Sequence, residues 1–403
     1  MDRITCFGFL FLMALVLQSQ SCTSSTAPLQ TEWPDIYDKF TTTRIVAPED
    51  LPPDATSLRF FPGSEDFLII GKPGQVYHFS LDTVGAHFLG QFIVPDVAPA
   101  PAEIGLTGLV FHPKFVTNKF LFMCYTTGDN KFNRIIRLKW QGTYAEIVSS
   151  IRTVIEIDRI FPDEPQHGIY DLCFGSDGML YAANGDATQP ELSQKKDVLL
   201  GKLIRINPDL DADGGYRIPL DNPFVGEPDT RPEIAAVGLR TPFRLAAWRD
   251  VIYIADVGEN SFEEIERYQL GKHNFGWPEC EGYCESSGFD APVFTISHAD
   301  PYYQTNDPSS ASTSNRLSIS LGFAYPENTA DPYDDLLDGR LIINDVFQGY
   351  VRAAHIQPDG VLANDQHIFH LDFATSMDMR PDGTIYCSTI FPSQIFRVDL
   401  KAD

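Results

Sequence analysis

The chain has 403 residues, and 55 Asp or Glu against 30 Lys or Arg give it a formal net charge of −25. A surface this acidic repels phosphate backbones and anionic lipid headgroups, which excludes nucleic acid as a partner. With 43% hydrophobic residues, 29 glycines and 29 prolines, the chain can bury a large core while turning often, which favours an all-β architecture.

The first 21 residues are typical of a signal peptide. Their apolar run, from Ile4 to Leu17, is too short to cross a bilayer as a stable helix. Cys22 follows this run and precedes a polar stretch, as the lipid-attachment cysteine of a bacterial lipoprotein does; ordinary cleavage nearby is the alternative. In both cases we expect export to the periplasm or the cell envelope. Residues 22–40 would form a tether, and a membrane contact would be made only through a lipid on Cys22.

A weak repeat runs through residues 41–403. Each unit is a strand, a turn rich in Pro, Asp or Gly, and a second strand. The units begin at Ser57, Leu109, Leu172, Leu245, Gly339 and Met377. Six units of this kind predict one domain, a six-bladed β-propeller, in which each blade buries its faces against its neighbours, and Gln394–Leu400 would close the ring. A β-sandwich pair is the alternative.

The first candidate for chemistry is His167, which lies on a Gly-flanked loop before the strand Tyr170–Phe174. A histidine there can act as a general base near neutral pH. Asp186 ends the next strand of the same hairpin, which returns a carboxylate toward the histidine. We expect Asp186 to orient His167.

Two further features follow along the chain. Arg240 lies between Gly238, which frees the backbone, and Pro242, which stiffens it, so the loop can direct a guanidinium into a cavity. Cys280 and Cys284 flank a flexible spacer in a loop, and a local disulfide is plausible for an exported chain. Metal binding is the weaker option because no second cysteine pair follows.

The motifs occur in an order that resembles the soluble pyrroloquinoline-quinone (PQQ)-dependent aldose (glucose/sorbosone) dehydrogenase family. The resemblance covers nearly the whole mature chain. The segments that carry it are Gly105–Pro113, His167, Phe174–Tyr181, Gly185-Asp186, Leu199–Pro208, Ile218–Phe224, Gly238–Arg240, Asp256–Gly258, Glu263–Ile265 and Asn274–Pro278. The family fold is a six-bladed propeller.

The resemblance implies a sugar dehydrogenase in which hydride passes from an aldose to the quinone. His167 stands at the position of the family's base, and Asp186 at that of its orienting carboxylate. Arg240 stands where an arginine stabilises charge on the quinone oxygens, and Thr241 replaces an asparagine that is typical of the next position. Glu264 falls at a calcium-ligand position; without calcium, it would belong to a solvated charged edge.

Several positions depart from the family pattern. Known members hold the tricarboxylate PQQ with a lysine and a pair of arginines from the last two blades. Here Phe373–Ser376 occupies the arginine positions, and the strand around Asp345–Gly349 offers no lysine. The usual Gly-Gly-Arg near His167 is replaced by Ile169–Asp171.

Two function classes therefore stay open. In the first, the protein oxidises a sugar with PQQ, arginines of other loops replace the missing ones, and the electron acceptor is unknown. The arginines in question are Arg316, Arg340 and Arg352. In the second, the propeller binds a carbohydrate or a protein at the cell envelope without redox chemistry.

Overall fold

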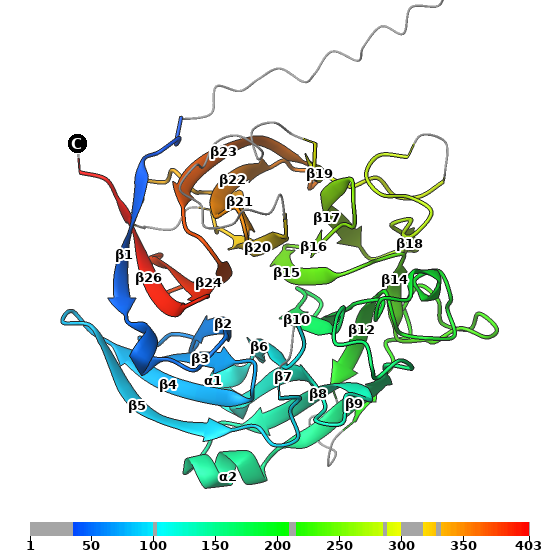
Figure 1. The fold of residues 1–403 in the computed structure, drawn as a ribbon, viewed down its shortest axis with the longest axis horizontal. Coiled ribbons are helices and arrows are strands. Elements are labelled where there is room, and N and C mark those ends of the chain that lie inside the picture. The colour runs from blue at the N-terminus through cyan, green and yellow to red at the C-terminus, as the bar shows by residue number, and fades with distance from the viewer. Residues whose placement is uncertain are drawn as a thin grey trace, which may run out of the picture. The chain divides into compact units, whose positions relative to one another are not determined.

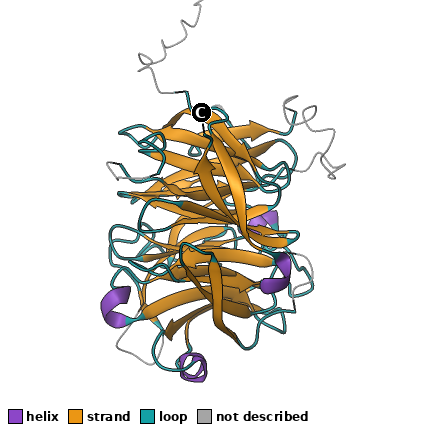
Figure 2. Ribbon diagram, turned by 90° about the vertical axis from the view of Figure 1, so that its left-hand side faces the viewer, coloured by secondary structure: helices purple, strands orange, loops and turns teal. Residues whose placement is uncertain are grey.

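The computed structural model describes residues 35–99, 103–208, 215–284, 288–299, 317–327 and 332–402. Its strands form six sheets around a common axis, which confirms the predicted six-bladed propeller (Figure 1). Figure 2 shows the molecule from the side, with strands forming nearly all of its regular structure and only a few short helices. The compact unit starts at Asp35, and Ile36 and Phe40 are already fully buried in it.

The first three blades are built from consecutive strands. The first blade comprises β2 (Ala55–Phe60), β3 (Phe67–Gly71), β4 (Gln75–Leu81) and β5 (Ala86–Ile93). The second comprises β6 (Leu106–Phe111), β7 (Phe120–Thr126), β8 (Phe132–Lys139) and β9 (Arg152–Asp158). The third comprises β10 (Ile169–Phe174), β11 (Leu180–Asn184), β12 (Lys202–Pro208) and β14 (Ile234–Val237), with β13 (Tyr216–Arg217) and β18 (His273–Asn274) at its margins.

The remaining blades complete the ring. The fourth comprises β15 (Pro242–Trp248), β16 (Val251–Asp256), β17 (Phe262–Gln269) and β19 (Phe294–Ser297). The fifth comprises β20 (Ile319–Ala324), β21 (Arg340–Asp345), β22 (Tyr350–Ile356) and β23 (Leu362–His370). The sixth comprises β24 (Ala374–Met379), β25 (Ile385–Ile390), β26 (Ser393–Leu400) and β1 (Phe40–Val46).

Helical segments in the described residues are short. They are α1 (Phe115–Asn118), α2 (Tyr144–Ser149) and the 3-10 turns Pro48–Asp50 and Pro190–Leu192. Within the part of the chain that the structure describes, none of these segments has the length and apolar character needed to cross a membrane.

Period-two alternation explains how one strand serves two neighbours. In β3 every residue is buried. Phe67 and Ile69 pack toward the sixth blade, whereas Leu68 and Ile70 pack toward the second. Because successive side chains point to opposite faces of a sheet, a fully apolar strand fits between two other blades. Six apolar clusters fill the six spaces between blades in this way.

The ring closes between the two ends of the described chain. β26 pairs in antiparallel register with β1, with Phe40 opposite Leu400 (Figure 1). The predicted closing strand, Gln394–Leu400, therefore receives its outer partner from the N-terminal part of the propeller. This closure supplies an interaction that would otherwise be missing at the open edge of a sheet.

One repeat unit differs from the prediction. The unit expected at Gly339–Val351 corresponds to the second and third strands of its blade, β21 and β22, rather than to the first two. The first strand, β20, starts at Ile319, directly after residues 300–316, which lie outside the described structure. The repeat pattern identified the blade but not its innermost strand.

The innermost strands share a local irregularity. β2, β6, β10, β15 and β24 each carry a register shift at their second residue, and the residues concerned are Thr56, Thr107, Tyr170, Phe243 and Thr375. A bulged residue leaves the regular ladder, so its backbone groups are free to bond elsewhere. These five residues lie around the propeller axis, where they line a pocket.

Candidate functional site

The candidate site lies at the end of the blades where the innermost strand of each blade begins and its second strand ends. His167 precedes β10 and Asp186 follows β11, and the pairing of Ile169 with Asn184 brings the two loops together. Arg240 precedes β15 in the next blade, and Glu264 lies in β17 opposite Asp256 at the end of β16. The structure thus brings the four predicted side chains to the same end of the third and fourth blades.

His167 and Asp186 form a buried pair. Nδ1 of His167 lies 2.6 Å from Oδ1 of Asp186, and the residues are 8% and 0% exposed. Nε1 of Trp277 donates to Oδ2 of the same carboxylate at 2.9 Å, and the Thr188 amide donates to Oδ1 at 2.8 Å. A carboxylate held by three neighbours fixes the imidazole with Nδ1 as donor, which leaves Nε2 as the acceptor for a proton.

Arg240 is tied to this pair through both backbone and side chain. Its carbonyl accepts the amide of Asp186 at 2.9 Å, and its guanidinium lies 5.5 Å from the ring centroid of Trp277. Nη1 donates to the Val257 carbonyl at 3.0 Å. A cation held in one direction beside a candidate base suits the stabilisation of negative charge that develops next to it.

Asp256 fixes the backbone of the loop that carries Arg240. Its two carboxylate oxygens accept the amides of Arg240 at 2.9 Å and Thr241 at 2.6 Å. Burial nevertheless raises the pKa of Asp256 to about 7, because these bonds and the Arg240 charge offset desolvation only partly. The same loop needs the glycine at 238, which has φ +84°, since a Cβ there would lie 2.5 Å from the Asn274 side chain.

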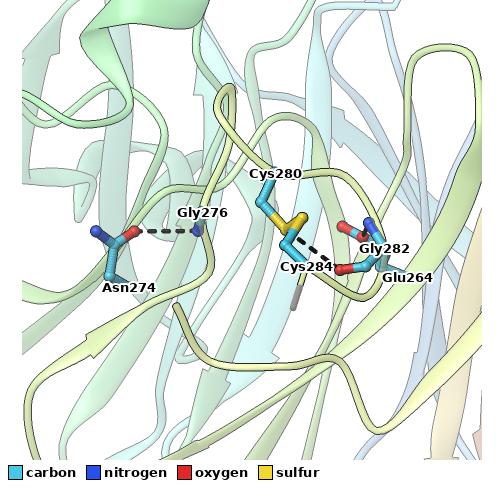
Figure 3. The surroundings of a disulfide bond; sticks show 6 residues. All are labelled: Glu264, Asn274, Gly276, Cys280, Gly282 and Cys284. Atoms are coloured by element: carbon cyan, nitrogen blue, oxygen red, sulfur yellow. Dashed lines mark hydrogen bonds between the residues drawn. A yellow bond between two sulfur atoms is a disulfide. The ribbon is translucent and has the colours of Figure 1, made fainter. Parts of the chain in front are cut away.

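Glu264 meets the disulfide loop (Figure 3). Cys280 and Cys284 are bonded to each other, with their Cα atoms 5.9 Å apart, and the Gly282 amide between them donates to Oε1 of Glu264. Burial, together with the charge of Asp256, raises the pKa of Glu264 to about 8. The loop therefore supplies a hydrogen-bond donor to a carboxylate in an acidic and poorly solvated setting.

The acidic cluster around Glu264 does not make a complete metal site. In the described residues, no three His, Cys, Asp or Glu side chains lie together in a way that could hold an ion. Both carboxylate oxygens of the neighbouring Glu266 are buried without a hydrogen-bond partner. Burial raises the pKa of Glu266 well above its ordinary value, and the charge of Glu264 adds to this effect.

A pocket of about 160 Å³ lies on the propeller axis beside these residues. All six blades contribute to its lining. The lining residues are Thr56, Lys72, Glu103, Thr107, Tyr170, Thr241, Phe243, Arg244, Val257, Ser318, Val346, Phe347, Thr375, Ile390 and Phe391. Thr241 and Val257 both accept hydrogen bonds from Nη1 of Arg240, so the pocket adjoins the His167 site.

Arg244 closes the floor of the pocket. Its guanidinium donates to the carbonyls of Thr375 at 2.9 Å, Tyr170 at 3.0 Å and Thr56 at 2.5 Å, which belong to three different blades. These carbonyls come from the bulged residues of the innermost strands, so one buried cation uses the backbone groups that the bulges free. Asp171 lies 3.9 Å away as its countercharge.

The arginines that were to replace the missing cations do not reach the pocket. Arg340 starts β21 at the end opposite Asp345, and Arg352 forms an ion pair with Asp365 in the outer strands. Neither residue lines the pocket. Arg316 and Cys22 lie outside the described residues. The expectation that Arg340 or Arg352 fills this role is therefore wrong.

Three residues of the candidate site were not predicted from the sequence. Trp277 orients Asp186, Asp256 holds the loop of Arg240, and Arg244 closes the pocket. Trp277 and Asp256 lie in segments that carried the family resemblance, so the motif order marked them without giving their roles. Arg244 stands in an ordinary strand sequence, and only the meeting of several blades reveals its function.

Comparison with known proteins agrees with this architecture. The family model described as glucose/sorbosone dehydrogenase matches residues 53–389. Aldose sugar dehydrogenase YliI from Escherichia coli is 27% identical over 349 residues, which cover 83% of this chain and 86% of that protein. HIPL1 protein from Arabidopsis thaliana is 28% identical over 309 residues, or 62% of this chain, but the match spans only 44% of the length of HIPL1.

Solved structures show the same fold. The PQQ-bound form of an aldose sugar dehydrogenase from Streptomyces coelicolor superposes with a TM-score of 0.69 at 20% identity, covering 90% of this chain and 99% of that one. The family match spans most of the chain and includes the loops that carry His167, Asp186 and Arg240. The chain belongs to the glucose/sorbosone dehydrogenase family.

Proposed function

We propose that this protein is an oxidoreductase that oxidises an aldose-type sugar at the mouth of the propeller, with a quinone as the electron acceptor. The observation that carries the proposal is the buried His167–Asp186 pair, oriented by Trp277 and placed next to Arg240. Family membership supports the same reaction class.

The chain's own groups supply the proton chemistry. Nε2 of His167 takes the proton of a sugar hydroxyl, and the C–O bond gains double-bond character as hydride leaves the same carbon for a two-electron acceptor. The products are a lactone from an anomeric hydroxyl, a reduced acceptor and a protonated imidazole, which Asp186 stabilises. General-base catalysis of this kind contributes roughly two to four powers of ten.

PQQ is the acceptor that the resemblance implies, and when bound it accepts the hydride on its quinone ring. The residues here do not fit its three carboxylates. The segment Phe373–Ser376, which stands at the arginine positions, holds no cation, and Arg244 donates to three backbone carbonyls. The acceptor in this proposal is therefore a quinone other than this tricarboxylate.

Calcium at Glu264 is a second proposal carried by the resemblance. Its support is electrostatic, since the charge of Asp256 raises the pKa of both Glu264 and Glu266 in a buried region, and a bound cation would offset that repulsion. A bound cation should stabilise the fold by RT ln(1 + [Ca²⁺]/Kd), and Glu264→Gln should remove that gain. Equal melting temperatures with and without calcium in the wild type would refute the site.

We further propose that the protein is exported and anchored at the bacterial cell envelope through Cys22. The support is the apolar run that ends close to this cysteine. Cys22→Ala should move the protein from the membrane fraction to the soluble fraction. A mature N-terminus that begins at another residue would contradict lipid attachment.

The activity is tested with purified protein, an aldose panel and an artificial electron-accepting dye. Separate reactions receive calcium with PQQ and calcium with a monocyclic benzoquinone. We expect aldose-dependent dye reduction that falls at least a hundredfold in His167→Ala. His87→Ala is the matched control, because His87 is exposed on β5, and it should keep full activity.

A propeller that binds a carbohydrate or protein without redox chemistry is the second candidate. The substituted cation positions favour it. If no aldose gives dye reduction with either acceptor, the dehydrogenase proposal fails, and a glycan array becomes the decisive measurement for this second function.

A further inference from the structure

We propose that the axial pocket binds one flat, uncharged six-membered ring of the benzoquinone or hydroquinone kind, and that it discriminates against a three-ring tricarboxylate. This inference rests on the proposed function for its redox meaning, but the binding itself is independent of activity. It follows from the charge balance, the lining and the size of the pocket.

The charges that line the pocket are balanced. Arg244 faces Asp171, and burial lowers the pKa of Lys72 although Asp54 and Glu103 raise it. Tyr170 donates to Glu103 at 2.9 Å. Beside the pocket, Arg240 donates hydrogen bonds to the Val257 carbonyl and the Thr241 hydroxyl rather than to a carboxylate. One such cation suits a ligand with a single partly negative oxygen, whereas three carboxylates would remain largely uncompensated.

Aromatic rings lie at and beside the segment where the resemblance implies cations. Phe373 belongs to that segment, Phe373–Ser376, and its ring packs edge-on against Phe347 at 6.4 Å and Phe391 at 5.9 Å. Phe347 and Phe391 line the pocket, and Phe391 is 51% exposed at the rim. Across the pocket, Phe243 packs against Tyr170 at 5.4 Å. Offset and edge-on contacts with such rings favour a planar ligand.

The hydroxyl groups at the floor add little capacity to donate hydrogen bonds. Thr56, Thr107 and Thr375 already donate to the carbonyls of Leu106, Ile169 and Ala55. They retain acceptor lone pairs, which suit the hydroxyl groups of a hydroquinone. The pocket thus offers aromatic faces and a few acceptors rather than a set of donors for carboxylates.

Size supports the same ligand class. The pocket measures about 160 Å³. An apolar cavity of about 150 Å³ in another protein binds benzene. One six-membered ring therefore matches the space.

The test is isothermal titration calorimetry of the full chain with hydroquinone and, separately, with PQQ at pH 7. Wild-type protein should give saturable heat with hydroquinone and none with PQQ over the same concentrations. Phe391→Leu should weaken hydroquinone binding about two- to tenfold, the range expected for one aromatic contact. Phe88→Leu is the control, because Phe88 is 52% exposed on β5 of the first blade and should change nothing.

A second variant reverses the selectivity. Gln348→Lys combined with Phe373→Arg returns two cations to the edges of the fifth and sixth blades and should create measurable PQQ binding. Saturable PQQ binding by the wild type, no binding of hydroquinone, or equal effects of Phe391→Leu and Phe88→Leu would each overturn the inference. Hydroquinone binding without any sugar oxidation would leave it intact and refute only the proposed function.

Discussion

The two sides of the propeller mouth are built from different chemistry. On the side of the third and fourth blades, His167, Asp186 and Arg240 are linked by hydrogen bonds and by the ring of Trp277. On the side of the fifth and sixth blades, the ring of Phe373 makes edge-to-face contacts with Phe347 and Phe391. Under the proposed function, the groups that move a proton and the groups that hold the quinone belong to different blades, so each set can change without the other.

The largest effect is expected on the side of the third and fourth blades, where the polar groups lie. Asp186→Asn keeps the shape of the side chain but places an amide against Nδ1 of His167, so the imidazole loses its orientation. We expect kcat to fall by about two to four powers of ten with little change in KM. Steady-state kinetics with the preferred aldose measure both constants.

Asp82→Asn is the matched control, because Asp82 is an exposed carboxylate that also faces a histidine. A similar loss in both variants, or a rise in KM that accounts for the whole effect of Asp186→Asn, would show that Asp186 does not orient a base.

A smaller effect is expected at the floor that joins the two sides. Arg244→Met leaves the carbonyls of Thr56, Tyr170 and Thr375 without their donor inside the protein. We expect the free energy of unfolding to fall by about 3 kcal/mol, the size of a few lost buried hydrogen bonds. Denaturant unfolding measures it.

Arg249→Met provides the comparison, since Arg249 is 58% exposed and pairs with an exposed Glu327. Its loss should cost at most about 1 kcal/mol. If the two variants are equally stable, Arg244 does not hold the innermost strands together.

The smallest effect is expected on the pH dependence of stability at Asp345, which holds the loop of Phe347 on the side of the fifth and sixth blades. Asp345 accepts the amides of Ser318, Phe347 and Gln348, yet burial raises its pKa to about 7. The folded state thus keeps this proton after the unfolded state has lost it. The stability that Asp345 contributes should therefore be complete below about pH 4, near the usual pKa of an aspartate, and disappear as pH rises toward 7.

Asp345→Asn should flatten this part of the stability profile between about pH 4 and 7, which unfolding curves at several pH values can detect. Parallel profiles for the variant and the wild type would mean that Asp345 is ionised in the folded protein throughout this range.

Sequence patterns predicted the ring better than they predicted the mouth. Repeated strand pairs reveal blades because a buried strand needs apolar side chains on both faces, as β3 shows with Phe67–Gly71. The proximity of His167 and Asp186 was also predictable, because His167 precedes the first strand and Asp186 follows the second strand of one hairpin.

Other parts of the site depend on contacts between distant segments. Arg244 is separated from Thr375 by 131 positions and from Thr56 by 188, so no local pattern marks their hydrogen bonds. The departures at Phe373 and Thr375 were visible as missing cations. That aromatic rings gather beside them follows only from the packing of the fifth blade against the sixth.

The most direct test of the separation between the two sides measures hydroquinone binding and aldose turnover on the same preparations of wild type, His167→Ala and Phe391→Leu. We predict that His167→Ala loses at least a hundredfold in turnover but less than twofold in affinity. Phe391→Leu should lose affinity about two- to tenfold and regain its turnover at saturating quinone. Parallel losses of affinity and turnover in His167→Ala would contradict the account.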